Sequence, residues 1–172
     1  AMGWDTVTPI PTYVKVTNGY EDASASGAEY PLQVMNPHYL RRAHSVFDNI
    51  GWLREAWTNP VFISTADADA AGVSDGDTVL VSSPYGQCVR NACVYAGLMP
   101  GVVALPHGAW VAVDEETGID VAGADNCLTG PAPNGQGVSG YNSALCKIEK
   151  YTGEALAPDA EQPLRIVCKD GE

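Results

Sequence analysis

The amino-acid sequence predicts a mainly β domain with short helices and long loops. The chain has 172 residues, enough for one domain with a single core, and 45% of them are hydrophobic. Its 18 glycines and 12 prolines interrupt the sequence too often for long helices. The apolar runs between them are short, which is typical of strands joined by tight turns.

The chain divides into a lead-in, residues 1–29, and a folded domain, residues 30–172. The lead-in has little apolar periodicity, so we expect an extended surface segment, whose first three residues we interpret as a cloning remnant. The folded domain holds the apolar runs, and no second domain is required. The sequence has no apolar run of about 18 residues and no signal-peptide pattern, so neither a membrane span nor a signal peptide is expected.

The first predicted elements are a strand and a short helix. Residues 30–36 alternate as a strand, and Pro37 should end it in a loop because it lacks a backbone donor. Residues 48–57 are expected to be helical, with Asp48 or Asn49 as the N-cap. Their helical spacing comes from the apolar residues Ile50, Leu53 and Trp57. We expect Trp52 and Trp57 to be core or staple residues rather than platforms for a ligand.

A second strand and helix are predicted over residues 60–72. Residues 60–64 form a compact apolar strand. Ser64 or Thr65 is then expected to cap a helix through Ala71, because hydroxyl oxygens satisfy free amides at a helix start. Gly72 should end that helix, since glycine readily adopts the left-handed conformation required there.

The rest of the chain predicts a hairpin, a buried strand, a long loop and a last strand. Asp75-Gly76 indicates a tight turn before antiparallel strands at residues 78–82 and 87–96, which are joined by a turn at 84–86. Residues 102–106 lack alternation, as expected for a strand covered on both faces. Residues 111–140 form a loop of a length that is usually functional or disordered. Residues 143–149 alternate as a strand, and residues 163–168 are a candidate for one more.

Charge and cysteine content exclude several classes of function. The net charge is −12, from 9 basic and 21 acidic residues, which disfavours binding to nucleic acid or anionic membranes. The five cysteines are Cys88, Cys93, Cys127, Cys146 and Cys168. They contain no CxxC pair and no histidine at zinc-like spacing, so buried free thiols are expected and a metal cluster is not. The chain also lacks the common nucleotide-binding, hydrolase and metalloprotease motifs.

The loop after the first strand concentrates rare polar residues. It holds His38, Arg41, Arg42, His44 and Ser45, which include two of the three histidines and two of the nine basic residues. Such a loop can cradle an anion or a polar ring system. An irregular connection whose side chains cap backbone groups explains the same residues, and composition alone leaves both interpretations open.

An ordered set of short motifs resembles one known family, the C-terminal domain of molybdopterin oxidoreductases, and within it the catalytic subunit of anaerobic dimethyl sulfoxide reductases. The resemblance covers about residues 30–151. The motifs are Pro37-His38, RAHS at 42–45, FDN at 47–49, ADAAG at 68–72, DGD at 75–77, MPGVV at 99–103, LPHGAW at 105–110, NCLT at 126–129 and residues 142–150.

The resemblance implies a six-stranded double-psi β-barrel that binds part of a bis(molybdopterin guanine dinucleotide) cofactor. The implied cofactor-binding residues are His38, Arg42, His44, Ser45, Asn126 and Asn142. Arginine, histidine and asparagine side chains suit pyrophosphates and pterin rings because they supply hydrogen-bond donors, and asparagine also supplies an acceptor. The molybdenum ligand and any iron-sulfur cluster are expected outside this chain, so the isolated fragment should lack the cofactor and be inactive.

The resemblance also implies a respiratory setting. The expected activity of the whole enzyme is two-electron oxygen-atom transfer, as in reduction of dimethyl sulfoxide or a related S- or N-oxide in anaerobic respiration. The expected partners are the remaining domains of the catalytic subunit, an iron-sulfur electron-transfer subunit and a membrane anchor subunit. The implied location is the outer face of the cytoplasmic membrane, reached by the twin-arginine route.

Two other functions use a similar barrel. A non-catalytic double-psi barrel that recognises protein or peptide would show the same strand, helix and turn signature without any pterin. A self-processing decarboxylase barrel needs a Gly-Ser dipeptide, which this chain lacks. The first alternative therefore stays open and the second is nearly excluded.

Overall fold

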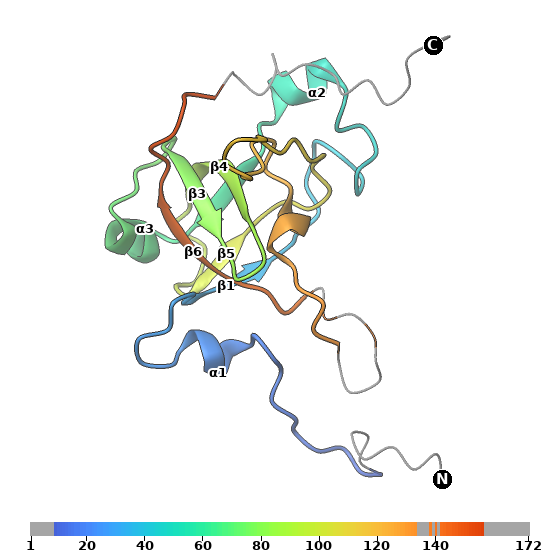
Figure 1. The fold of residues 1–172 in the computed structure, drawn as a ribbon, viewed down its shortest axis with the longest axis vertical. Coiled ribbons are helices and arrows are strands. Elements are labelled where there is room, and N and C mark those ends of the chain that lie inside the picture. Colours follow the sequence, from blue (N-terminus) through green and yellow to red (C-terminus); the bar gives the residue numbers. More distant parts are fainter. Residues whose placement is uncertain (1–8, 134–137, 139, 141, 157–172) are drawn as a thin grey trace.

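The computed structural model describes residues 9–133, 138, 140 and 142–156, and over this part of the chain it shows a closed barrel (Figure 1). Around the barrel the strands follow the order β1-β5-β2-β4-β3-β6. Their bounds are β1 Leu32–Met35, β2 Pro60–Ile63, β3 Thr78–Ser82, β4 Gln87–Val94, β5 Val102–Ala104 and β6 Leu145–Lys150. The helices are α1 Tyr20–Ala23, α2 Gly51–Ala56, α3 Thr65–Ala71 and the 3₁₀ helix η1 Asp125–Leu128. The predicted mainly β barrel is confirmed.

Two parallel strand pairs determine where the loops emerge. β1 pairs with β5 and β2 pairs with β4 in parallel, whereas the other neighbours are antiparallel. Closing the sheet leaves no open edge, so backbone groups pair around the barrel. Because β1 and β5 run in the same direction, the loops that follow both strands leave from the same end of the barrel.

The barrel interior is filled by apolar side chains that alternate along the strands. Val61, Ile63, Val79, Val81 and Val103 are fully buried, in agreement with the period of two expected for strands. Two cysteines, Cys88 and Cys146, are also fully buried there. Burial raises the pKa of the Cys88 thiol to about 12, so this thiol stays protonated at neutral pH. The four described cysteines are free thiols as predicted, but only Cys88 and Cys146 are buried, whereas Cys93 and Cys127 are half-buried. Cys168 lies outside the described residues.

Helix α3 forms where its sequence signals predicted it. The Ser64 hydroxyl accepts a hydrogen bond from the Asp67 amide at 3.1 Å, which satisfies one free donor of the first turn. At the other end Gly72 has a φ of 65°, the left-handed conformation that glycine adopts without strain. The local sequence is therefore sufficient to define both ends of this helix.

Helix α2 differs from its prediction in two ways. It begins at Gly51, and its N-cap residue Ile50 makes no side-chain cap. The expected cap residue Asp48 is buried instead between two arginine side chains, because compensating buried guanidinium groups outweighs capping. Trp52 is exposed, so its predicted place in the core was wrong, whereas Leu53 is buried as predicted.

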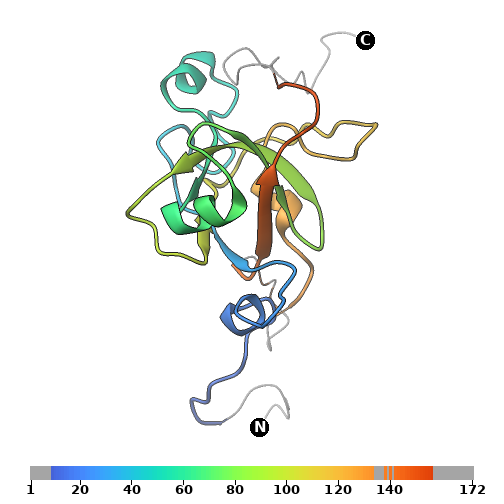
Figure 2. The same ribbon diagram turned by 90° about the vertical axis from the view of Figure 1, so that its left-hand side faces the viewer.

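The lead-in contributes one turn of helix that the sequence did not predict. Its described residues before α1 are mostly exposed, and α1 lies beside the barrel near β1 (Figures 1 and 2). The proposed division of the chain at residue 29 stays a prediction, and the candidate strand at residues 163–168 lies outside the described residues. Among the helices of the described part, none combines the length and apolar character required to cross a bilayer.

The long loop between β5 and β6 is organised by one buried carboxylate. Asp120 accepts hydrogen bonds from the backbone amides of Ala112, Ala122 and Ala124. These bonds fold the part of the loop that projects from the barrel back toward its wall (Figure 2). The loop then enters η1, and Asp120 thereby fixes the position at which η1 begins.

Candidate functional site

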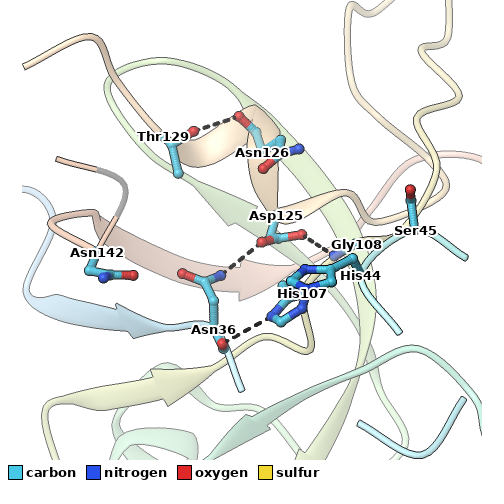
Figure 3. A pocket seen from close by; sticks show the side chains of 9 residues that line it. All are labelled: Asn36, His44, Ser45, His107, Gly108, Asp125, Asn126, Thr129 and Asn142. Carbon is cyan, nitrogen blue, oxygen red and sulfur yellow. Dashed lines mark hydrogen bonds between the residues drawn. The ribbon is translucent and has the colours of Figure 1, made fainter. Parts of the chain in front are cut away.

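A pocket of about 520 Å³ lies beside the barrel, where loops from four parts of the chain meet (Figure 3). The pairing of the strands explains why these loops lie close together. Asn36 follows β1 and His107 follows the parallel strand β5, so both leave from the same end of the barrel. Asn142 precedes β6, which is antiparallel to β1, and therefore lies at that end too. The complete lining is Asn36, His44, Ser45, His107, Gly108, Asp125, Asn126, Thr129 and Asn142.

Asp125 joins three of these segments. One carboxylate oxygen accepts a hydrogen bond from the Asn36 side-chain amide at 3.0 Å, and the other accepts one from the Gly108 backbone amide at 3.1 Å (Figure 3). A ring nitrogen of His107, Nδ1, lies 3.3 Å from the Asn36 carbonyl oxygen. Both oxygens of Asp125 are thus engaged within the pocket wall, so this carboxylate maintains the shape of the pocket.

All three histidines of the chain lie together at this pocket. The ring of His107 stacks on that of His44 with centroids 5.0 Å apart. His38 contacts both rings edge-on, at 5.4 Å from His44 and 4.5 Å from His107. Two loops that are distant in the sequence therefore present imidazole rings to one place.

Gly108 allows these two loops to approach closely. Its φ is +88°, and a Cβ atom at this position would lie only 1.9 Å from the carbonyl oxygen of His44. Any side chain would therefore clash with the backbone of the facing loop and would also strain its own backbone. Glycine is required here for the pocket to close.

Arg42 lies behind the pocket wall. Its side chain is fully buried and donates to Asp48 at 2.8 Å and to the carbonyl oxygens of His107 and Pro106 at 2.9 and 3.2 Å. Burial lowers the pKa of the guanidinium, and the neighbouring Asp48 carboxylate opposes that effect. Arg42 therefore holds the segment that ends in His107.

Arg90 supports the pocket from the barrel side. It is fully buried and donates to the carbonyl oxygens of Gly123, Pro60 and Pro106 at 2.8, 3.0 and 2.9 Å. Burial lowers its pKa to about 10, so the guanidinium stays charged at neutral pH. Arg42 and Arg90 thus converge on one carbonyl, that of Pro106, and fix the segments that lead to His107 and to η1.

Trp110 holds the loop that carries His44 and Ser45 in place. Its backbone amide donates to Asp48 and its indole nitrogen donates to the carbonyl oxygen of Ser45, both at 2.9 Å. These bonds place the Ser45 side chain at the pocket edge. Trp110 therefore fixes the position of this loop through two hydrogen bonds.

Four of the six residues predicted for the site line the pocket, and the other two lie next to it. The four lining residues are His44, Ser45, Asn126 and Asn142. His38 adjoins the pocket through its ring contacts, and Arg42 is enclosed behind the wall. Whether these residues bind a ligand stays a prediction.

Five lining residues were not among those predicted for the site: Asn36, His107, Gly108, Asp125 and Thr129. His107 and Gly108 entered the sequence analysis only as part of the LPHGAW motif. A signal did exist for the first two, since Asn36 ends one predicted strand and His107 directly follows another. Using that signal required knowing that the two strands are parallel neighbours.

The chemistry of the lining favours a polar heterocycle. Asparagine amides present a donor and an acceptor together, and imidazole rings present either according to tautomer. None of the described lining residues is a lysine or arginine, and the described part of the chain contains no group of three or more histidine, cysteine or acidic side chains able to hold a metal ion. Cys127, next to Asn126, is not a thiolate at neutral pH, because burial and two nearby carboxylates raise its pKa to about 11. The pocket is suited to binding and orienting a ring system.

Comparison with known proteins identifies related domains. Residues 32–144 match the family model described as "Molydopterin dinucleotide binding domain". The probable dimethyl sulfoxide reductase chain YnfF of Escherichia coli is 35% identical over 147 residues, which is 84% of this chain and 18% of that protein. The dimethyl sulfoxide/trimethylamine N-oxide reductase of Cereibacter sphaeroides is 33% identical over 162 residues, which is 88% of this chain and 19% of that protein.

A solved structure supports the fold. Acetylene hydratase from Pelobacter acetylenicus superposes with a TM-score of 0.70 at 21% identity, over 83% of this chain and 21% of that chain. This likeness concerns the fold alone. The present chain spans less than one fifth of the length of the curated relatives named above.

Proposed function

The chain belongs to the molydopterin dinucleotide binding domain family, and from this premise we propose that it is the C-terminal part of the catalytic subunit of a dimethyl sulfoxide reductase-like molybdenum oxidoreductase. In this proposal the pocket holds part of a bis(molybdopterin guanine dinucleotide) cofactor. The observation that carries it is the meeting of His44, Asn126 and Asn142, from three separate segments, in one polar pocket.

The residues of the pocket fit a pterin dinucleotide. A pterin ring carries alternating donors and acceptors, which the amides of Asn126 and Asn142 match. Ser45 and the imidazoles of His44 and His107 are donors suited to phosphate oxygens. Because buried hydrogen bonds within the chain fix the wall, we expect little side-chain ordering on binding.

In this proposal the chain binds and orients the cofactor. When bound, the molybdenum centre would supply the two-electron chemistry of oxygen-atom transfer. We expect the physiological substrate to be dimethyl sulfoxide or a related S- or N-oxide, in line with the names of the relatives. Among the described residues that line the pocket, no hydroxyl group is hydrogen-bonded to an imidazole or a carboxylate. In this proposal the chain contributes by positioning the cofactor.

The proposed setting of the whole enzyme follows from the same family. We expect the remaining catalytic domains to contact this chain directly, and an iron-sulfur subunit with a membrane anchor subunit to deliver electrons. The proposed location is the outer face of the cytoplasmic membrane after twin-arginine export. The pocket itself does not favour the alternative of peptide recognition, because its described lining consists of polar side chains and one glycine.

The test is cofactor retention in the complete catalytic subunit. Asn126→Ala combined with Asn142→Ala should lower molybdenum and pterin content together, because both amides would lose their bonds to the ring. Asn91→Ala is the matched control, since Asn91 is an exposed amide on β4 away from the pocket. Full occupancy in the double variant, measured by elemental analysis and pterin fluorescence, would count against the proposal.

A further inference from the structure

The loop of residues 39–52 carries an apolar surface beside the pocket. Four large side chains are exposed on it, namely Leu40 at 72%, Val46 at 55%, Phe47 at 51% and Trp52 at 66%. Single exposed apolar residues are common, but several within one short loop are typical of an interaction surface. We refer to these four side chains as the apolar loop surface.

This surface is uncharged in a strongly acidic protein. The chain has 21 acidic residues, yet between Tyr39 and Trp52 the only one is Asp48, which is buried. The two arginines of this loop, Arg41 and Arg42, are buried as well. The loop therefore exposes apolar side chains without the charges that cover other parts of the molecule, a composition found at the centres of interfaces.

The loop is held in its outward conformation. His44 and Phe47 have φ values of 51° and 75°, a left-handed conformation that is strained in residues other than glycine. The inner side of the loop is filled by Arg41 and Arg42 paired with Asp48 at 3.0 and 2.8 Å. Because these charged groups occupy the interior, the apolar side chains cannot turn inward.

A further bond fixes the junction of this loop with α2. Arg54 of α2 donates to the carbonyl oxygen of Asp48 at 2.7 Å. The Ile50 amide donates to the carbonyl oxygen of Phe47 at 3.0 Å, which closes the turn that leads into the helix. Trp52, in the first turn of α2, is thus presented on the same rigid segment as Phe47.

We propose that the apolar loop surface is the docking site for the rest of the same catalytic subunit. This inference rests on the proposed function, because it requires that the chain be one part of a longer enzyme. The matched region makes up only 18–19% of the length of the two curated relatives named above, so both proteins extend far beyond it. His44 and Ser45 lie on the same loop and line the pocket, so a domain seated on Phe47 and Trp52 would also border the cofactor site.

The first test is hydroxyl-radical footprinting of this chain alone and of the complete catalytic subunit. Oxidation of Phe47 and Trp52 should fall by about fivefold or more in the complete subunit, because an interface core excludes water. Equal oxidation in both samples would overturn the proposal. A cofactor-free preparation of the subunit keeps this result separate from cofactor binding, since protection there supports docking even if Asn126 and Asn142 prove not to bind a pterin.

The second test uses a variant of the surface, Phe47→Asn combined with Trp52→Gln. Asparagine tolerates the left-handed backbone, so the isolated chain should keep its melting temperature. In the complete subunit, limited proteolysis should release this domain about tenfold faster than in the wild type. Met99→Gln, at a residue 67% exposed but outside the loop, is the control and should leave proteolysis unchanged. Unchanged proteolysis of the double variant would contradict the proposal.

A second copy of this chain is the competing occupant. Sedimentation velocity of the isolated chain separates the two cases. A monomer supports docking of the rest of the subunit, whereas a dimer that Trp52→Gln dissociates would overturn it.

Discussion

The pocket loops and the segment from β2 to β4 are held together in different ways. The β2 to β4 segment depends on local contacts, such as the Ser64 cap on α3 and the hairpin of β3 and β4. The pocket depends on buried polar bonds between distant residues, for example Arg42 to His107, which are 65 residues apart, and Asn36 to Asp125, which are 89 apart. A local segment can form from its own sequence, whereas the pocket exists only when the whole barrel is closed.

This contrast predicts that buried polar groups behind the pocket matter more to stability than local caps. Asp48→Ala is expected to have the largest effect, because two buried guanidinium groups lose their carboxylate. We expect a loss of about 3–5 kcal/mol in the free energy of unfolding, measured by urea titration. The exposed carboxylate of Asp69 on α3 is the control, and Asp69→Ala should change stability by less than about 0.5 kcal/mol. Similar losses for both variants would remove the contrast.

Gly108→Ala should be the next most damaging change. The added methyl group would meet the His44 carbonyl oxygen at 1.9 Å and would strain the backbone at a φ of +88°. We expect a loss of about 3 kcal/mol, together with altered NMR signals of the histidine rings.

Gly118 is the matched control for Gly108. It also has a positive φ, +71°, but nothing lies within 4 Å of an added Cβ atom. Gly118→Ala should therefore cost only the backbone strain, about 1 kcal/mol, and leave the histidine signals unchanged. An equal cost at the two glycines would show that close approach of the loops is unimportant.

Arg42→Lys should have an intermediate effect. Lysine keeps the positive charge near Asp48 but cannot reproduce the fork of bonds to the carbonyl oxygens of His107 and Pro106. We expect a loss of about 2 kcal/mol and weaker cofactor retention in the complete subunit. Loss of cofactor without any loss of stability would instead indicate direct contact between Arg42 and the ligand.

Ser64→Ala should have the smallest effect. It removes the hydroxyl that accepts from the Asp67 amide, and about 1 kcal/mol is expected from the loss of such a cap. The Ser64 hydroxyl also donates to Asp67, which accepts from the Gly101 amide just before β5. Amide hydrogen exchange should therefore increase in α3 and at Gly101 and stay constant at His107 and Gly108. Faster exchange at the pocket would show that the two regions are coupled.

The same contrast explains what the sequence could predict. Helix α3 and the hairpin were predicted because their signals, Ser64, Gly72 and Asp75-Gly76, lie within a few residues of the structure they determine. The exposed position of Trp52 and the buried position of Asp48 were not predicted. Trp52 lies off the helical face defined by its apolar neighbours, and the partners of Asp48 are recognisable only once the loop is folded.

The site was predicted in part for the same reason. Local composition identified His44 and Ser45, and the family resemblance identified Asn126 and Asn142. Asn36 and His107 were omitted because their proximity follows from the parallel pairing of β1 with β5, which alternation within each strand does not reveal. The family resemblance also identified Arg42, and the sequence alone does not show that its side chain is buried behind the wall. That Arg42 contacts a ligand stays a prediction.

The most direct test of the pocket as a cofactor site is an experimental structure of the complete catalytic subunit with its cofactor bound. We expect side-chain nitrogens of His44, Asn126 and Asn142 at about 3 Å from polar atoms of one pterin dinucleotide. A cofactor that contacts none of these three residues would contradict this expectation.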